Sequence, residues 1–471
     1  MHGNTTVAQT QAAGIYNARY VGLISTVAAL GGLLFGYDFV VIGGAKPFYE
    51  AYFRLSSQAS IGWANSCALL GCLLGSLLSG ALSDRLGRKK LLIVSAFLFA
   101  LSSVLTGWAH AFNAFVFWRI AGGVAIGIAS NVSPTYIAEV SPAPWRGRLV
   151  SLNQLTIVIG ILAAQIMNWI IAQPVPAKAN AEFIRQSWNG QAGWRWMFAA
   201  VAVPSLVFLL SAWFVPESPR WLVKNNRYSE ARRILSRIGG LAYGQAAAEE
   251  VQKILGVEAQ SRARVSELGR PRVRKLVAIG VGLAVLQQWS GINIIFNYAE
   301  EIFSSAGYSV NDLLFNIVVT GSINLVFTLS ALGLVDRFGR RALMLSGCAG
   351  IALSHALLGT AYFLHVRGLP ILLLTLTAIG LYAMSLAPVT WVLISEIFPN
   401  RIRGLAVSIA VSALWIACFV LTFTFPILNA FLGAAGAFWL YALICLFGCA
   451  LILCVPETKG KSLEELERQL I

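Results

Sequence analysis

The sequence predicts an all-α polytopic membrane protein with twelve transmembrane helices, arranged as two pseudo-symmetric six-helix bundles with a cytoplasmic helical domain between them. The 471 residues are 57% hydrophobic and only 12% charged. That charged fraction is about half of what a soluble chain carries. Apolar runs of membrane-spanning length recur along the chain, and several charged phrases occur twice. Together these features predict a duplicated transporter whose halves rock against each other.

Twelve apolar runs approach the length of about 20 residues that a spanning helix needs. They cover residues 20–43, 58–83, 89–109, 113–138, 149–173, 194–215, 274–299, 311–335, 342–365, 370–395, 404–430 and 435–455. Because the number of spans is even, both termini are expected on the same side. The predicted division is an N-terminal segment (1–19), a first bundle (20–215), a helical linker (216–273), a second bundle (274–455) and a C-terminal tail (456–471).

The repeated phrases are charged and lie between the apolar runs. Residues 84–89 are echoed 252 positions later by residues 336–341, and further pairs recur at offsets of 257 and 240. We interpret them as ionic latches beneath each half that favour the outward-facing state. The alternative is that these charges only set the topology. The predicted latch residues are Asp84, Arg85, Arg88, Glu139, Arg146 and Glu217 in the first half, and Asp336, Arg337, Arg340, Glu396, Arg403 and Glu457 in the second.

The net charge of +15 is distributed as in a membrane protein. Residues 216–275 carry 13 Lys and Arg against 6 Asp and Glu, and the other basic clusters lie at the same ends of alternate spans. This positive-inside pattern predicts that these loops and both termini are cytoplasmic. We therefore expect a lipid bilayer, and no nucleic acid, as the partner of the basic surface. Helical periodicity after Ser229 predicts that the linker is a small helical bundle, the alternative being a solvated connector.

The cysteines and histidines indicate no disulfide framework and no metal site. All seven cysteines fall inside predicted spans, and the four histidines show no metal-ligand spacing. The spans contain no nucleophile or paired base that predicts catalysis. We expect neither a cofactor nor a catalytic residue, and the first span is expected to remain as an anchor because no signal-peptide pattern precedes it.

Two opposite charges inside the spans form the first candidate site, Asp38 and Arg119. The first span runs outward and the fourth runs inward, which puts these residues about 12 Å and about 9 Å from the outer ends. We therefore expect an ion pair. An intramembrane charge costs several kcal/mol unless it is paired, hydrated or functional. One interpretation is a static salt bridge, and the other is a proton site in which protonation of Asp38 releases Arg119.

Amide and indole side chains in the spans form the second candidate site. Amides both donate and accept hydrogen bonds, which suits hydroxyl groups. Gln288 and Asn293 are five residues apart, and Gly291 offers a helix break that lets them converge. The pattern predicts a neutral, polyhydroxylated substrate, although single amides also serve as interhelical hydrogen bonds. The residues are Gln154, Gln165, Gln287, Gln288, Asn293, Asn297, Asn324, Trp391 and Trp415.

These phrases resemble the sugar porter family of the major facilitator superfamily along nearly the whole chain. The resemblance is strongest to bacterial xylose/proton-type symporters and extends more distantly to facilitative glucose transporters. It rests on residues 31–38, the two Asp-Arg-x-Gly-Arg loops, residues 119–123, 133–139, 216–222, 287–293 and 456–460.

The resemblance implies a role for each matching residue. Asp38 matches the acid of the proton-coupled members, and Arg119 matches its partner. Phe35 matches an aromatic wall, Tyr298 an outer gate, and the sugar contacts are matched by Gln154, Gln287, Gln288, Asn293, Asn324 and Trp391. The chain departs from the family pattern at Asn297, Ala387 and Leu414, where relatives often have tyrosine, glycine and an amide. These departures leave the sugar open.

The expected function is proton-coupled symport of a monosaccharide, a hexose or pentose, by alternating access. The expected partners are the sugar and a proton, and we expect a monomer in the inner cell membrane. A facilitative uniporter is the first alternative, and sugar-induced alkalinisation of the medium would separate the two. A nutrient receptor on a transporter scaffold is the second alternative, and the short predicted tails argue against it.

Overall fold

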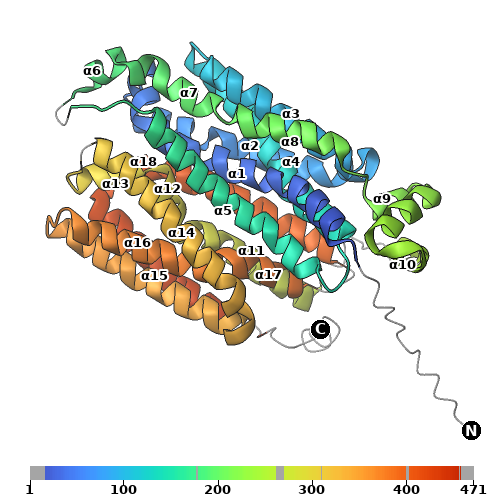
Figure 1. Ribbon diagram of the computed structural model, residues 1–471. Coiled ribbons are helices and arrows are strands. Elements are labelled where there is room, and N and C mark those ends of the chain that lie inside the picture. The colour runs from blue at the N-terminus through green and yellow to red at the C-terminus, as the bar shows by residue number, and fades with distance from the viewer. Residues whose placement is uncertain are drawn as a thin grey trace, which may run out of the picture.

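The computed structural model describes residues 16–176, 179–260, 270–308, 310–398, 402–455 and 457, and every regular element in them is helical. Figure 1 shows the helices lying side by side in two groups, with α1 to α8 in one and α11 to α18 in the other. The two groups are the two halves of the molecule. The end of the bundle that carries α9 and α10 is named the linker side, and the other end the far side.

The first half contains six spans. They are α1 (Ala18–Phe53), α2 (Gln58–Leu86), α3 (Arg88–Gly107), α4 (Phe112–Val140), α5 (Arg146–Ile171) and a sixth span built from a π-helical turn (Asn189–Gly193), α7 (Trp194–Ala199) and α8 (Ala202–Phe214). A short helix, α6 (Ala181–Gln186), precedes the sixth span. Trp194, Phe115, Phe198 and Tyr49 are fully buried together near the far side.

The second half also contains six spans, several of them interrupted. It comprises α11 (Pro271–Trp289), α12 (Ile292–Asn297), α13 (Ala299–Ser305), α14 (Val310–Phe338), α15 (Arg340–Phe363), α16 (Leu369–Met384), α17 (Leu386–Glu396) and α18 (Arg403–Leu453). The long α18 is two helices that meet at Gly433, whose φ is 67°. In the part of the chain described, eleven helical stretches are long and apolar enough to cross a membrane, and α18 supplies two of the twelve spans. The predicted fold is confirmed.

Two elements differ from the predicted boundaries. The first helix continues to Phe53, ten residues beyond the predicted end at residue 43. Lys46 lies in this extension, and it stays helical and buried because three carboxylates surround its ammonium group. The tenth span breaks at Ser385, where α16 ends and α17 begins.

The linker between the halves folds into helices, as the periodicity after Ser229 predicts. It contains α9 (Pro219–Lys224) and α10 (Tyr228–Gln260), which turns sharply at Gly239 and Gly240. Leu235, Ile238 and Ala248 pack with Val21 of α1 in a small apolar cluster. This cluster fixes α10 against the beginning of α1. The predicted tail falls outside the described residues except for Glu457.

Candidate functional site

The predicted ion pair between the first and fourth spans is present. Arg119 Nη1 of α4 donates to Asp38 Oδ1 of α1 at 2.9 Å, and its Nη2 donates to the backbone oxygen of Asp38 at 3.4 Å. Both residues are buried, with 3% and 4% of their surfaces exposed. The guanidinium also lies 5.3 Å from the centre of the Phe198 ring. The other carboxylate oxygen, Asp38 Oδ2, has no hydrogen-bond partner among the described residues.

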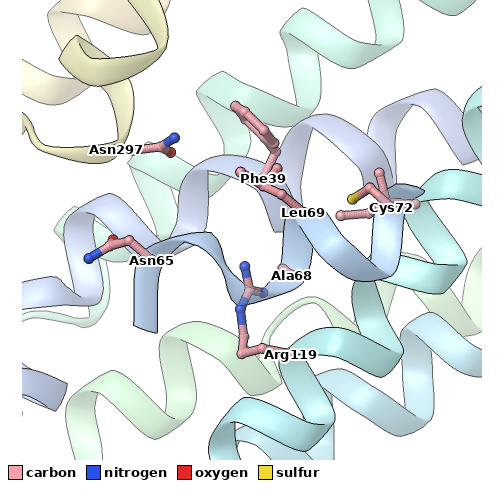
Figure 2. Close-up of a pocket in the computed structure, with 8 residues that line it drawn as sticks. Phe39, Asn65, Ala68, Leu69, Cys72, Arg119 and Asn297 are labelled. Atoms are coloured by element: carbon pink, nitrogen blue, oxygen red, sulfur yellow. The ribbon is translucent and has the colours of Figure 1, made fainter. Parts of the chain in front are cut away.

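A small cavity adjoins this pair. Figure 2 shows the Arg119 side chain extending from α4 toward α2, with Asn65 on one side and Asn297 beyond it. Because Asn297 belongs to α12, the cavity borders both halves of the molecule. Its amide and guanidinium groups supply the polar partners that an enclosed water molecule requires. The lining residues are Phe39, Asn65, Ala68, Leu69, Cys72, Arg119, Ile126 and Asn297.

The amide residues of the seventh span converge as the glycine spacing predicts. Gly291 adopts φ 86° and separates α11 from α12, a conformation that glycine adopts without steric cost. Across this break, the Asn293 amide donates to Gln288 Oε1, and Gln288 Nε2 donates to Gln287 Oε1 at 3.2 Å. Gln287 Nε2 in turn donates to the backbone oxygen of Ala387 in α17 at 3.2 Å. The break therefore creates a chain of three amides joined to a second helix.

The interface between the halves brings together four more of the predicted binding residues. The rings of Phe35 in α1 and Trp415 in α18 have centroids 5.8 Å apart. Gln165 in α5 is 1% exposed, and neither of its amide atoms has a hydrogen-bond partner among the described residues. It lies against Gly321 of α14, where a Cβ atom would approach Gln165 Oε1 to 1.8 Å. Asn297 Oδ1 and the Trp415 indole nitrogen also lack partners there.

Such unpaired buried groups carry an energetic cost that a ligand can remove. Leaving one buried donor or acceptor without a partner costs about 1–3 kcal/mol. Here several of them, from α5, α12 and α18, occur at one interface. A polyhydroxylated molecule between the halves would supply the missing hydrogen bonds, so this arrangement fits a sugar better than an apolar ligand.

The remaining predicted substrate and gate residues are more scattered. Gln154 in α5 is half-buried, Asn324 in α14 is buried, and Trp391 in α17 is 39% exposed, the most open of the predicted binding residues. Tyr298, between α12 and α13, is fully buried, and its hydroxyl donates to the backbone oxygen of Thr422 at 2.6 Å. The structure does not join these four residues to the chain of three amides through a direct hydrogen bond.

The first-half latch is formed within that half. Arg88 Nε lies 3.0 Å from a carboxylate oxygen of Glu139, and the Ser218 hydroxyl donates to the same carboxylate at 2.5 Å. Asp84 pairs with Lys224 of α9 at 2.8 Å and lies 3.5 Å from Arg88. These contacts join the ends of α2, α3 and α4 to the start of the linker.

Glu217 caps a helix and does not form the predicted ion pair with another described residue. Its carboxylate accepts hydrogen bonds from the backbone N–H groups of Arg88 at 2.9 Å and Lys89 at 3.1 Å. These are unsatisfied donors at the N-terminus of α3, where a negative charge is also favoured by the helix dipole. Two predicted latch residues do not take part. Arg85 and Arg146 are exposed, and neither forms an ion pair with another described residue.

The second half repeats the helix cap and one ion pair. Glu457 accepts hydrogen bonds from the backbone N–H groups of Arg340 and Arg341, both at 3.1 Å, at the start of α15. Arg340 Nη2 lies 3.7 Å from Glu396, a looser counterpart of the Arg88–Glu139 pair. The repeat therefore preserves a carboxylate that caps the third helix of each half.

The remaining predicted latch residues of the second half are Arg403, Asp336 and Arg337. Arg403 donates to the backbone oxygen of Phe398 at 3.1 Å. Arg337 is exposed, and the side chain of Asp336 lies outside the described part of the structure. Each of these latch contacts joins residues of one half or its adjoining linker, so the latches tie helices together within a half.

One charged cluster was not predicted. Lys46 in α1 contacts Glu50 of the same helix and Glu300 and Glu301 of α13. No role was predicted for Lys46 from the sequence. The available signal was a lysine four residues before a glutamate on one helical face, together with two adjacent acids at the end of the seventh span.

Comparison with known proteins agrees with this architecture. The profile of the family described as "Sugar (and other) transporter" matches residues 24–470. The D-xylose-proton symporter of Escherichia coli strain K12 is 39% identical, with 96% of each chain covered. The arabinose-proton symporter of Bacillus subtilis strain 168 is 37% identical, with 95% of each chain covered. The glucose transport protein of a Synechocystis strain is 39% identical, covering 96% of this chain and 97% of its own.

Solved structures give the same result. A partially occluded, inward-open structure of the E. coli xylose transporter matches with a TM-score of 0.83 at 35% identity, covering 94% of this chain and all of that one. An inward-open structure of the same transporter gives 0.82 at 36% identity and 96% coverage of this chain. The chain belongs to the sugar transporter family of the major facilitator superfamily, and it is a multi-pass membrane transporter rather than an enzyme.

Proposed function

We propose that this protein is a proton-coupled monosaccharide symporter that works by alternating access as a monomer. The observation that carries the proposal is the buried Asp38–Arg119 pair, in which one carboxylate oxygen lacks a partner among the described residues. Relatives named as proton symporters of xylose and arabinose support the coupling. The linker side, with its basic loops, faces the cytoplasm in this proposal, as do both termini.

The coupling step follows from the electrostatics of the pair. In a low-dielectric span, an ionised Asp38 binds Arg119 strongly, and removing the charge of either partner leaves the other uncompensated. A proton on Asp38 Oδ2 cancels the carboxylate charge and weakens the hold on Arg119. Because α1 and α4 are joined by this pair, its release frees them to move relative to each other. The proton thereby permits the transition that carries the sugar.

The sugar site lies between the halves, near the break at Gly291. Gln287, Gln288 and Asn293 present donors and acceptors from the second half, and Gln165 supplies an unpaired amide from the first. Phe35 and Trp415 supply ring faces suited to the C–H surface of a pyranose. Among the described residues, the three amides of the second half hydrogen-bond to one another and to backbone oxygens of α17 and not to a lysine or arginine, which fits a neutral substrate.

The latch residues hold each half as a rigid unit in this proposal. Glu217 and Glu457 cap the third helix of their own halves, and Glu139 and Glu396 bind arginines there. The main movement is then rocking between the bundles, and release of the Asp38–Arg119 pair adds a local shift of α1 against α4 within the first half. Facilitated diffusion by a uniporter is the alternative. The intact Asp38–Arg119 pair, with its carboxylate oxygen that has no partner among the described residues, favours coupling.

Replacing Asn293 by alanine is expected to raise the KM for sugar exchange by at least about tenfold, the value of one lost buried hydrogen bond to a hydroxyl. The measurement is counterflow in proteoliposomes with glucose, galactose, xylose and arabinose as competing sugars. Counterflow needs no proton gradient, so it tests sugar binding separately from coupling.

Asn131→Ala is the matched control. Asn131 lies in α4 and donates to Ser76 and Ser79 inside the first half. Its loss is expected to lower thermal stability without changing the KM. If Asn293→Ala leaves the KM unchanged for every transported sugar, the proposed sugar site is wrong.

A further inference from the structure

We propose that Lys46, Glu300 and Glu301 form an ionic lock that closes the far side of the transporter by joining its two halves. The proposal rests on the proposed alternating access, and it adds a specific gate to it. The lock consists of the contacts from Lys46 to Glu300 and to Glu301. Neither the Asp38–Arg119 pair nor the latch contacts involve these three residues.

The contacts are short, and they cross from one half to the other. Lys46 Nζ lies 3.0 Å from Glu300 Oε2 and 2.5 Å from Glu301 Oε1. Lys46 belongs to α1 of the first half, whereas both glutamates belong to α13 of the second. The lysine side chain is 2% exposed, and those of the glutamates are 26% and 23% exposed. Lys46 is therefore sealed beneath the carboxylates, which reach toward solvent.

The backbones of the two halves are also in direct contact beside the lock. At Gly43, one turn before Lys46, a Cβ atom would lie 2.3 Å from the backbone oxygen of Phe296 in α12. Only a glycine permits this approach of α1 to α12. Trp169 of α5 and Phe315 of α14 also meet across the interface, with ring centroids 5.9 Å apart. The far side is therefore closed in this structure, and the lock lies at the closure.

A third carboxylate makes the lock reversible. Glu50 lies one turn after Lys46 on α1, and its Oε1 is 3.1 Å from Lys46 Nζ. When the halves separate, Lys46 keeps this partner, so its charge is never left unpaired in a poorly hydrated position. Glu300 and Glu301 are already partly exposed and gain water on opening. The three carboxylates thus lower the cost of breaking the contacts between the halves.

The lock is mechanically connected to the proposed proton site. Lys46 and Asp38 are eight residues apart on α1, which corresponds to about 12 Å along an unbroken helix. A shift of α1 that accompanies release of Arg119 also moves Lys46 relative to α13. Tyr298 lies at the same place, with the Lys46 ammonium 5.7 Å from its ring centre. The proposed gate on the far side therefore combines a charged contact, the lock, with the aromatic side chain of Tyr298.

The test measures the opening of the far side directly. Spin labels are attached at Ser56, in the turn after α1, and at Leu364, at the end of α15. Both positions are exposed on the far side. The background carries Cys454→Ser and Cys449→Ala, because these two cysteines are not fully buried. Distances between the labels are measured by double electron–electron resonance in lipid nanodiscs without sugar.

The double variant Glu300→Gln/Glu301→Gln is expected to raise the ratio of wide to narrow distances about tenfold, a typical size for a coupling between two states. Lys46→Gln removes the shared ammonium and is expected to act in the same direction. Glu50→Gln is the matched control. It lies in the same cluster but pairs within α1 and supports Lys46 in the open state, so its loss is expected to leave the ratio of wide to narrow distances unchanged or lower it, and not to raise it.

An unchanged distribution in both lock variants would overturn the proposal. Equal widening in Glu50→Gln would also overturn it, because the effect would then come from the total charge of the cluster. Sugar counterflow measured on the same preparations separates this outcome from a failure of the proposed function. If either of these outcomes is seen while counterflow is intact, only the proposed lock is refuted. Absent counterflow in the unmodified protein refutes the proposed function, whereas the distances still test the lock.

Discussion

Asp38→Asn is expected to abolish uphill sugar accumulation while sugar exchange persists. Asparagine keeps the shape of the side chain and can still accept a hydrogen bond from Arg119, but it cannot gain or lose a proton. The variant therefore loses the energy that proton entry supplies, which is about 2.3 kcal/mol per charge for each 100 mV of membrane potential. At that potential the lost accumulation is roughly fiftyfold in sugar concentration.

The measurement compares uptake in energised proteoliposomes with counterflow in proteoliposomes that have no gradient. Asp312→Asn is a suitable control, because it removes an exposed acid at the start of α14. The control is expected to accumulate sugar as the unmodified protein does. Uphill accumulation by Asp38→Asn would show that the proton binds elsewhere.

Arg119→Met is expected to cost about 3–5 kcal/mol of stability when Asp38 is ionised, because it leaves a buried carboxylate without its partner. Methionine retains much of the side-chain volume, so packing against Phe198 changes little. The effect should appear as a lower melting temperature in detergent.

The double variant Asp38→Asn/Arg119→Met tests the origin of this loss. It contains no buried charge at the pair, so its stability is expected to recover toward that of the unmodified protein, although symport stays absent. Such recovery is the non-additivity expected of two residues in contact. If the two losses simply add, Asp38 and Arg119 do not stabilise the fold through their mutual contact.

The sequence predicted the twelve spans well because the membrane requires long apolar helices, which composition reveals directly. It also predicted the Asp38–Arg119 pair, since two opposite charges at similar depth have few other partners. The convergence of Gln288 and Asn293 was predictable because Gly291 is a residue type that breaks a helix there. In each case a feature that can be read directly along the sequence, such as a residue type or its depth in a span, determined the outcome.

Other contacts were not predictable because they depend on how distant helices pack. Glu217 and Glu457 cap helices that begin far from them in sequence, and no local pattern distinguishes a cap of this kind from an ion pair. Arg85 and Arg146 match the repeated phrases, but they are exposed and form no ion pair with another described residue. Lys46 was missed because its partners Glu300 and Glu301 lie in the other half, about 250 residues away, and only the packing of α1 against α13 joins them.

The central claim is that a proton enters with each sugar through Asp38. The most direct test is to measure proton uptake and labelled sugar uptake together, in lightly buffered proteoliposomes without an imposed gradient. The account predicts that adding a transported sugar makes the medium more alkaline, with one proton for each sugar as the expected stoichiometry, and that Asp38→Asn removes the pH change. Sugar entry by the unmodified protein with no change in external pH would contradict the account and identify a uniporter.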